Sequence, residues 1–361
     1  MISGGGTGGH VYPALAVADQ LPDCQFLYIG SRGGVEEGII RREGLPFAAI
    51  SAGGLRGLTP WKVAWNFIKL AAGFVQSLGI MRRFAPDAVL VTGGYVCVPV
   101  VLAAKFWGVP VLIFLPDLEP GLAIRSLSRL AARIAVSFPE SAGFFTNERV
   151  VVTGYPVRAE FFAAEKTKAR RAFGLDEDLK TVTVFGGSHG ARSINLALCS
   201  ILNRLLETCQ VIHICGQLDA DWVMRRREEL PPRLRGRYKV YPYLHEGMAD
   251  ALAAADLVVA RAGAATLGEF PALGLPSVLV PYPYAGRHQE LNADYLVSRG
   301  AAVKVTDAEL REKLLLTVLS LLKDTDTLER MAERARALAQ PEAAQRIAAE
   351  ILKLALSKEA P

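Results

Sequence analysis

Short apolar runs alternate with longer stretches of helical periodicity along almost the whole sequence. Apolar runs that are rich in β-branched residues are typical of strands buried on both faces, and such strands occur in parallel sheets covered by helices. The sequence therefore predicts an α/β fold. We expect its strands over residues 25–29, 88–92, 109–114, 134–136, 150–153, 181–185, 210–214, 238–241, 257–260 and 277–281, with a short strand over 1–3 before the first glycine loop.

The length predicts two domains, because 361 residues exceed the size of roughly 250–300 at which a single hydrophobic core stops growing. A change of character after Pro156 marks the boundary, where a charged segment precedes a new strand and a new glycine loop. The glycine loops over 4–10 and 186–192 show that the two halves repeat a strand, turn and helix unit. We expect domains over 1–157 and 158–340, followed by a terminal helix over 341–361.

Composition excludes several classes of protein. The net charge of +5 is too small for a dedicated nucleic-acid binder, and 51% apolar residues exclude a disordered chain. The five cysteines are odd in number and lack a C-x-x-C spacing, which indicates free thiols in a reducing compartment and no zinc site. The sequence begins with a glycine loop rather than the basic and apolar regions of a leader, and it has no run of 18 uncharged apolar residues, so we expect a cytoplasmic protein without a spanning helix. We also expect neither a metal nor a cofactor.

The first glycine loop places Gly4, Gly6 and Gly9 in G-x-G-x-x-G spacing, which lets backbone amides approach a phosphate. A nicotinamide enzyme is one interpretation, although Arg32 rather than an acidic residue follows the second strand and at best fits NADP.

His10 ends this loop. It is either a capping residue at the helix start or an exposed base that takes a proton from a sugar hydroxyl.

The second glycine loop has two interpretations. Gly186, Ser188 and Gly190 match the G-x-S-x-G turn of serine hydrolases, with Asp256 and His288 as partners in the required order. The alternative, which we favour, is a phosphate site built from Ser188 and the loop amides.

A third loop over 261–269 brings another helix N-terminus to a ligand, because its residues are small and the helix dipole favours anionic oxygens. Glu269 is placed either to accept from ribose hydroxyls or to stabilise the helix dipole.

Arg158 is either a solvated arginine or the cation that neutralises a diphosphate. The polar cluster over 287–292 suits sugar hydroxyls, and Asp219 is expected to cap a helix rather than to bind a metal.

Residues 59–84 predict a long helix or helix pair that starts at Thr59 and Pro60. Its apolar side chains spread wider than one core-facing side, which indicates either extra core contacts or contact with a membrane. The residues concerned are Trp61, Trp65, Phe67, Ile68, Phe74, Val75, Leu78 and Met81, with basic neighbours at Lys62, Lys69, Arg82 and Arg83.

Several motifs in a fixed order together resemble the MurG family, the UDP-N-acetylglucosamine transferases that act on undecaprenyl-diphosphate-linked N-acetylmuramoyl-pentapeptide in peptidoglycan synthesis. The resemblance covers nearly the whole chain. It rests on GGGTGGHVYPALAVA from Gly4, GGYV from Gly93, GYPVR from Gly154, GGSHGARSIN from Gly186, RAGAATLGE from Arg261, and GLPSVLVPYP with RHQELNA after it.

The resemblance implies two Rossmann-like domains that face each other across a cleft, a GT-B-type fold whose C-terminal helix returns to the first domain. It implies an inverting transfer of N-acetylglucosamine with His10 as the base for the muramoyl 4-hydroxyl and without a metal. It also implies peripheral attachment to the anionic inner face of the membrane. The substrate-binding residues that it implies are Thr7, Gly8, Gly9, Asp117, Arg158, Ser188, Leu244, Ala264, Ala265, Thr266, Leu267, Gly268, Glu269 and Gln289. Among these, Leu244 is expected at the uracil, Glu269 at the ribose and Gln289 at the sugar.

Three departures from the family pattern concern the acceptor and the sugar. Phe114-Leu115-Pro116-Asp117 stands where the family usually reads HEQN, Cys97-Val98-Pro99-Val100 is less glycine-rich than the usual loop, and His189 replaces glutamine. Related UDP-sugar enzymes that glycosylate diacylglycerol share the fold and donor class, so they are the alternative reading.

Overall fold

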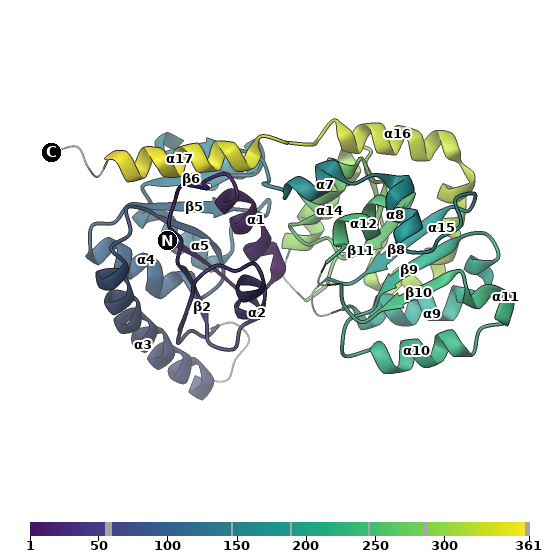
Figure 1. Ribbon diagram of the computed structural model, residues 1–361, viewed down its shortest axis with the longest axis horizontal. Helices are drawn as coiled ribbons and strands as arrows, with labels where there is room; N and C mark the ends of the chain where they lie inside the picture. The colour runs from purple at the N-terminus through teal and green to yellow at the C-terminus, as the bar shows by residue number, and fades with distance from the viewer. Residues whose placement is uncertain (55–59, 146, 188–189, 245, 285–286, 358–361) are drawn as a thin grey trace. The chain divides into compact units, whose positions relative to one another are not determined.

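The computed structural model describes residues 1–54, 60–145, 147–187, 190–244, 246–284 and 287–357. These residues form two compact α/β units, one from Met1–Arg158 with the chain from Pro341 onward and one from Ala159–Gln340 (Figure 1). Each unit is built around its own parallel sheet. The expected fold class is confirmed.

The first unit holds a seven-stranded sheet in the order β3-β2-β1-β4-β5-β6-β7, with every described pairing parallel. Its strands are β1 Ile2–Gly4, β2 Tyr28–Ser31, β3 Phe47–Ile50, β4 Val89–Gly93, β5 Val111–Leu115, β6 Arg133–Val136 and β7 Val150–Val152. Its helices are α1 Gly8–Ala18, α2 Val35–Arg42, α3 Pro60–Phe84, α4 Cys97–Phe106, α5 Leu122–Leu127, α6 Pro139–Ala142 and α17 Ala343–Ser357. The last of these, α17, packs against α1 and β5.

The second unit holds a six-stranded sheet in the order β10-β9-β8-β11-β12-β13, also parallel. Its strands are β8 Thr181–Phe185, β9 Gln210–Ile214, β10 Tyr238–Tyr241, β11 Leu257–Ala260, β12 Ser277–Leu279 and β13 Ala302–Lys304. Its helices are α7 Ala159–Ala163, α8 Lys166–Ala172, α9 Arg192–Leu206, α10 Ala220–Glu228, α11 Pro232–Arg235, α12 Met248–Ala253, α13 Thr266–Leu273, α14 His288–Ser298, α15 Leu310–Lys323 and α16 Thr325–Arg336.

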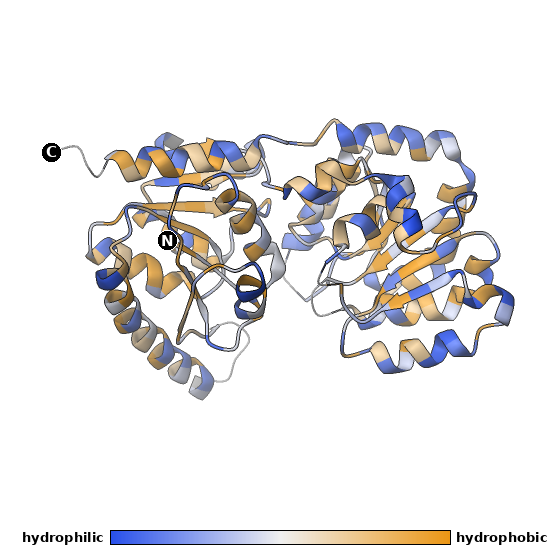
Figure 2. Ribbon diagram, viewed as in Figure 1, coloured by the Kyte–Doolittle hydropathy of each residue, from blue (hydrophilic) through white to orange (hydrophobic). Residues whose placement is uncertain are grey.

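Each sheet is apolar because helices cover both of its faces (Figure 2). All five residues of β4 are buried, and so are all five of β5. The strands of the first unit pack with α4 and the end of α3 into one core, while β8, β9 and β11 of the second unit pack with α9 and α15. Two strands, β3 and β13, were not expected from the sequence.

A single helix, α3, occupies the segment for which a helix or helix pair was expected. By length and composition alone, residues Trp61–Phe84 are long and apolar enough to cross a membrane. The contacts of α3 with α4 and β3 nevertheless place it on the first unit. Gly73 allows the helix to approach closely, since a Cβ there would lie 2.1 Å from the Ser51 carbonyl oxygen, and the Gln76 side chain accepts from the Ser51 amide at 2.7 Å.

Candidate active site

The first glycine loop lies where the strand order of the first sheet reverses. Strands β1 and β4 are neighbours, and the chain runs from β1 towards β2 on one side and from β4 towards β5 on the other. Ligands of open parallel sheets bind at such a switch point, beyond the carboxyl ends of the strands. The loop between Gly4 and Gly8, where α1 begins, and the loop after Gly93 are therefore both at the expected binding edge.

His10 lies in the first turn of α1, half-buried, with its imidazole in a defined orientation. Its Nδ1 lies 2.8 Å from the carbonyl oxygen of Gly5 and 3.5 Å from the Thr7 hydroxyl. A carbonyl oxygen only accepts hydrogen bonds, so Nδ1 must carry the proton. In the neutral ring Nε2 then holds the lone pair, which is the arrangement that a general base requires.

Glycines of the β4 loop make room for this ring. A Cβ on Gly93 would lie 2.8 Å from Nε2 of His10, and one on Gly94 would lie 2.5 Å from the Gly5 carbonyl oxygen. Both glycines also have positive φ, of 130° and 89°, which side chains rarely adopt. The GGYV motif is thus explained by close approach to the first glycine loop.

Hydrogen bonds between the first glycine loop with the start of α1 and the end of β4 fix the two loops to each other. The Gly5 amide donates to the Gly93 carbonyl at 3.1 Å, and the Thr92 hydroxyl donates to the His10 carbonyl at 2.5 Å. The Cys97 thiol also donates to Gly93 O at 3.0 Å. Burial raises the pKa of this thiol to about 12, so Cys97 remains a neutral donor rather than a nucleophile.

The other predicted residues of the first unit lie in different surroundings. Thr7 is exposed, and Asp117 is half-buried after β5, at the same edge of the sheet as Gly93. Arg158 ends the first unit, one residue beyond the boundary expected from the sequence. Its guanidinium lies 4.5 Å from the centre of the Tyr12 ring and 4.0 Å from the Glu43 carboxylate.

In the second unit the switch point lies between β8 and β11. The glycine loop after β8 and the loop from Arg261 to Ala265 after β11 therefore end at the same edge. A Cβ on Gly186 would lie 2.2 Å from the Ala191 amide nitrogen, so only glycine fits where the chain turns towards α9. Ser188 and His189 fall outside the described residues, and the predicted phosphate contact of Ser188 stays a prediction.

The start of α13 presents fewer open amides than expected. The amides of Thr266, Leu267 and Gly268 donate to the carbonyl oxygens three residues earlier, at 3.0–3.1 Å. The backbone hydrogen bonds among the described residues include none donated by the amides of Ala264 and Ala265, so these two are the candidates for binding an anion. The side chain of Leu267 is buried, whereas Glu269 is partly exposed in the first turn.

The remaining residues predicted to bind the donor follow strands of the second sheet in the sequence. Leu244 follows β10 and is half-buried against a cluster of apolar side chains. The Gln289 side-chain oxygen accepts from the Tyr282 amide at 2.9 Å, which leaves its NH₂ end for another acceptor. Asn292 has a different role from the expected sugar contact, because it is fully buried and donates to the Ala262 carbonyl at 3.1 Å.

Comparisons with known proteins agree with this arrangement. The glycosyltransferase family 28 N-terminal domain matches residues 1–136, and the glycosyltransferase family 28 C-terminal domain matches residues 181–347. The chain belongs to glycosyltransferase family 28.

Two curated relatives and one solved structure are similar over nearly their full lengths. Both relatives are called UDP-N-acetylglucosamine--N-acetylmuramyl-(pentapeptide) pyrophosphoryl-undecaprenol N-acetylglucosamine transferase. The protein from Roseiflexus sp. is 45% identical and covers 96% of this chain and 92% of its own length. The protein from Desulforudis audaxviator is 44% identical, with 98% of both chains covered. The crystal structure of Acinetobacter baumannii MurG is 31% identical, with a TM-score of 0.74 and 98% of both chains covered.

The family 28 assignment excludes the nicotinamide enzyme and the hydrolase that the glycine loops allowed. The structure gives an independent argument against the hydrolase, because Asp256 precedes β11 and lies at the amino ends of the strands. The G-x-S-x-G turn follows β8 at their carboxyl ends. Among the described residues no group of three His, Cys, Asp or Glu side chains could hold a metal ion.

Sequence reasoning missed a buried polar network that anchors α9 of this family 28 domain. The Asn195 side chain donates to the Cys215 carbonyl and to the Asp219 carboxylate, both at 2.8 Å, and its oxygen lies 2.9 Å from Nε2 of His213. Burial lowers the pKa of His213 to about 3, so this histidine is neutral and structural. Asp219, expected to cap α10, makes no side-chain cap bond and instead accepts from Asn195 and Arg192.

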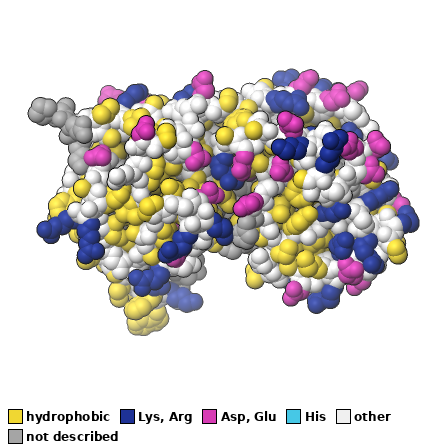
Figure 3. All heavy atoms as spheres, viewed as in Figure 1, with side chains coloured by type: hydrophobic (Ala, Val, Ile, Leu, Met, Phe, Trp, Pro, Cys, Tyr) yellow, Lys and Arg dark blue, Asp and Glu magenta, His cyan; other side chains and the backbone are white. Residues whose placement is uncertain are grey.

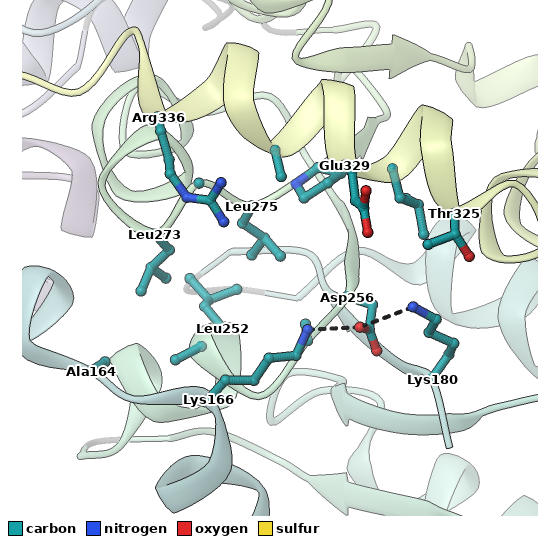
Figure 4. Close-up of a pocket in the computed structure, with 16 residues that line it drawn as sticks. Ala164, Lys166, Lys180, Leu252, Asp256, Leu273, Leu275, Thr325, Glu329 and Arg336 are labelled. Carbon is teal, nitrogen blue, oxygen red and sulfur yellow. Dashed lines mark hydrogen bonds and ion pairs between the residues drawn. The ribbon is translucent and has the colours of Figure 1, made fainter. Parts of the chain in front are cut away.

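A pocket of about 320 Å³ lies elsewhere on the second unit (Figure 4). Lys180, Asp256 and Pro276 line it, and each precedes a strand, so the pocket opens at the amino ends of β8, β11 and β12. This is the edge opposite to the glycine loops. The pocket is therefore not the predicted donor site.

Proposed function

We propose that this chain is an inverting hexosyltransferase of peptidoglycan synthesis. It moves N-acetylglucosamine from UDP-N-acetylglucosamine to the 4-hydroxyl of undecaprenyl-diphosphate-linked N-acetylmuramoyl-pentapeptide. The names of its relatives at 44–45% identity support this substrate pair. The single structural observation in its favour is the His10 ring, whose Nδ1 donates to Gly5 and whose lone pair on Nε2 is left at the switch point of the first sheet.

In the proposed reaction, Nε2 of His10 takes the proton of the acceptor 4-hydroxyl. The oxygen attacks C1 of N-acetylglucosamine from the face opposite the diphosphate, and the bond from C1 to the β-phosphate oxygen breaks with its electron pair on UDP. The new glycosidic link is β, and the imidazolium returns its proton to solvent. The amides of Ala264 and Ala265 and the N-terminal end of the α13 dipole stabilise the charge that develops on UDP.

A transfer assay tests this function against its runner-up. Radiolabelled UDP-N-acetylglucosamine is offered with lipid-linked muramoyl-pentapeptide and diacylglycerol in the same vesicles, and the products are separated. We expect label only in the muramoyl lipid. Label in diacylglycerol alone would reject the proposed acceptor and assign the departures at Asp117 and around Cys97 to a changed acceptor site.

We propose that Glu269 binds the ribose hydroxyls of the donor from the first turn of α13. Hydrogen bonds to a charged group contribute about 1.5–3 kcal/mol, so Glu269→Ala should weaken UDP binding by about ten- to a hundredfold. Isothermal titration calorimetry measures this. Glu312→Ala is the matched control, because Glu312 is an exposed glutamate in the first turn of α15. Equal affinity in both variants would mean that Glu269 does not bind the ribose.

We infer that the first unit is the acceptor domain and that it binds the inner face of the membrane through α3. Trp61, Trp65, Phe67, Ile68 and Val75 are 58–86% exposed on this helix. Figure 3 shows hydrophobic side chains beside Lys and Arg over the part of the view where Figure 1 places α3. Apolar side chains that enter the interface together with nearby cations are typical of peripheral membrane helices.

The neighbouring helix α4 extends this surface. Phe106 and Trp107 at its end are 66% and 44% exposed, and Lys105 beside them is also exposed. The Trp107 indole donates to the Leu78 carbonyl of α3 at 3.2 Å, which holds the two helices together. By contrast, Phe74 and Leu78 pack partly against the core and Met81 is 2% exposed, so these three residues make the core contacts that were the alternative to membrane contact.

The membrane surface predicts that Trp61→Glu/Trp65→Glu loses vesicle binding. Burial of one large apolar side chain contributes roughly 1.5–3 kcal/mol, so the double variant should bind at least about tenfold more weakly. Co-sedimentation with vesicles of phosphatidylcholine and phosphatidylglycerol measures binding, which should also weaken with salt. Leu218→Glu, on the second unit and 86% exposed in the parent, is the control. The surface is wrongly placed if both variants bind like the parent.

A further inference from the structure

Glu36 is a fully buried carboxylate beside the first glycine loop, and sequence reasoning gave it no role. It lies in the first turn of α2. One carboxylate oxygen accepts from the Ser31 amide at 2.7 Å, and the other accepts from the Gly6 amide at 3.2 Å. Glu36 thus joins the end of β2 to the loop that carries His10.

The space around this carboxylate is shaped by glycines from three segments. A Cβ on Gly5 would lie 2.5 Å from a carboxylate oxygen, one on Gly34 would also lie 2.5 Å away, and one on Gly30 would lie 2.7 Å from Cγ of Glu36. No larger residue fits at these positions without displacing the carboxylate. The site is therefore built around the side chain of Glu36.

The two contacts that matter for catalysis belong to one peptide group. The N–H of Gly6 and the C=O of Gly5 are the two polar ends of the peptide bond that joins these residues. Glu36 accepts from the first end, and Nδ1 of His10 donates to the second end at 2.8 Å. We propose that Glu36 is a positioning residue that acts on His10 through the Gly5–Gly6 peptide.

The physical basis is polarisation along a chain of hydrogen bonds. A carboxylate that accepts from an amide makes a charge-assisted hydrogen bond, and it increases the negative charge on the carbonyl oxygen of the same peptide. That oxygen then holds the Nδ1–H of His10 more strongly. The effect fixes the tautomer with the lone pair on Nε2 and stabilises the imidazolium that forms when Nε2 takes a proton. No proton moves along the relay.

The field of this carboxylate reaches the neighbouring groups of the loop. Burial raises the pKa of Tyr28 well above its usual range, and the charge of Glu36 adds to that shift. The Tyr28 hydroxyl in turn donates to the Gly4 carbonyl at 2.9 Å. Serine-protease triads use a carboxylate in direct contact with histidine for the same two tasks, whereas here a peptide lies between the two side chains.

The relay predicts the tautomer of His10 in the parent protein, independently of any transfer activity. Free histidine side chains favour the Nε2–H form. In the full chain labelled with ¹⁵N-histidine, at a pH where the ring is neutral, we expect His10 to show a protonated Nδ1 and a bare Nε2. Comparison with His10→Gln assigns its signals. A protonated Nε2 in the parent protein would overturn the proposal.

The role of the charge is tested with Glu36→Gln, which keeps the shape of the side chain. An amide has one accepting oxygen for the two N–H donors, so the Gly6 contact weakens. We expect the Nε2–H tautomer to increase and kcat to fall by roughly 10- to 100-fold, the range for losing the outer partner of a metal-bound histidine. The KM for UDP-N-acetylglucosamine should stay at the parental value. A purely structural anchor would not produce this split or the change of tautomer.

Glu37→Gln is the matched control for this experiment. Glu37 follows Glu36 directly, but it accepts from the Gly33 amide and from Arg41 at the surface. Its replacement should change neither the tautomer nor kcat. Where Glu36→Gln does not fold, judged by near-UV circular dichroism, Glu36→Asp keeps the charge with a shorter reach and should shift the tautomer in part. Parental tautomer and kcat in the folded Glu36 variant would overturn the proposal.

The kinetic measurement rests on the proposed function, in which His10 is the base. The measurement of the tautomer is independent of that function. If the parent protein transfers no sugar, the proposed function fails and the ¹⁵N spectra still decide the relay. If the parent transfers sugar and His10 carries its proton on Nε2, the relay fails and the proposed function stands.

Discussion

Replacing His10 with alanine is expected to lower kcat by about 10²–10⁴-fold, the usual contribution of a positioned general base. In the alanine variant, the hydroxyl of the acceptor substrate must lose its proton to water. Binding of UDP should remain close to the parental value, because the residues proposed to hold the nucleotide from α13 belong to the second unit. Turnover measured at saturating donor, together with calorimetry of UDP binding, separates the two effects.

Added imidazole provides the control for this loss. The alanine variant leaves a space beside Gly93, and imidazole in solution should restore part of the lost rate if a base is what is missing. Gly93→Ala should reduce turnover as well, since its Cβ would lie 2.8 Å from Nε2 and its φ of 130° strains any side chain. Full turnover of His10→Ala would show that His10 is not the base of the proposed reaction and only caps the start of the helix.

The parts of the fold that depend on local sequence patterns could be predicted from the sequence. Buried strands such as β4 and β5 are continuous apolar runs, and their alternation with helices predicted two parallel sheets. Strands β3 and β13 were missed because their sequences, FAAI and AVK, hold only one β-branched residue each and contain alanine, which is depleted in strands. Their assignment depends on pairing with β2 and β12, which is a tertiary property.

The candidate site shows the same division between local and tertiary information. His10 and the glycine loops were found because glycine spacing before a helix has a local physical meaning. Glu36 was not found, since an acidic pair in the first turn of a helix is an ordinary response to the helix dipole. One signal was present in the sequence: Gly30, Gly33 and Gly34 precede it closely, although only Gly33 has a positive φ. The distances from Gly5, Gly30 and Gly34 to the carboxylate explain the other glycines.

The second large effect is on stability, and it concerns Asp256 at the amino ends of the second sheet. Its carboxylate accepts from Lys166 at 2.7 Å, from Arg170 at 2.6 Å and from the Thr181 amide at 2.7 Å. Figure 4 shows Lys166 and Lys180 on either side of it. Arg170 is only 9% exposed, so water solvates its guanidinium poorly. The Asp256 carboxylate balances this charge.

We expect Asp256→Ala to destabilise the second unit by about 3–5 kcal/mol, because it leaves the buried Arg170 charge without its carboxylate partner. A loss of that size lowers the melting temperature by roughly 6–20 °C in a unit of this size. Differential scanning calorimetry measures this shift. Asp256→Asn, which can still accept from the Thr181 amide, should be affected less.

Glu329→Ala is the matched control for this prediction. Glu329 lines the same pocket from α16, but it is exposed to solvent, and such substitutions usually change stability by less than about 0.5 kcal/mol. Below its melting temperature, Asp256→Ala should still bind UDP with parental affinity, because Asp256 and the glycine loops lie at opposite ends of the strands. A loss of UDP affinity in the folded variant, or a destabilisation no larger than that of Glu329→Ala, would show that these ion pairs do not stabilise the sheet as proposed.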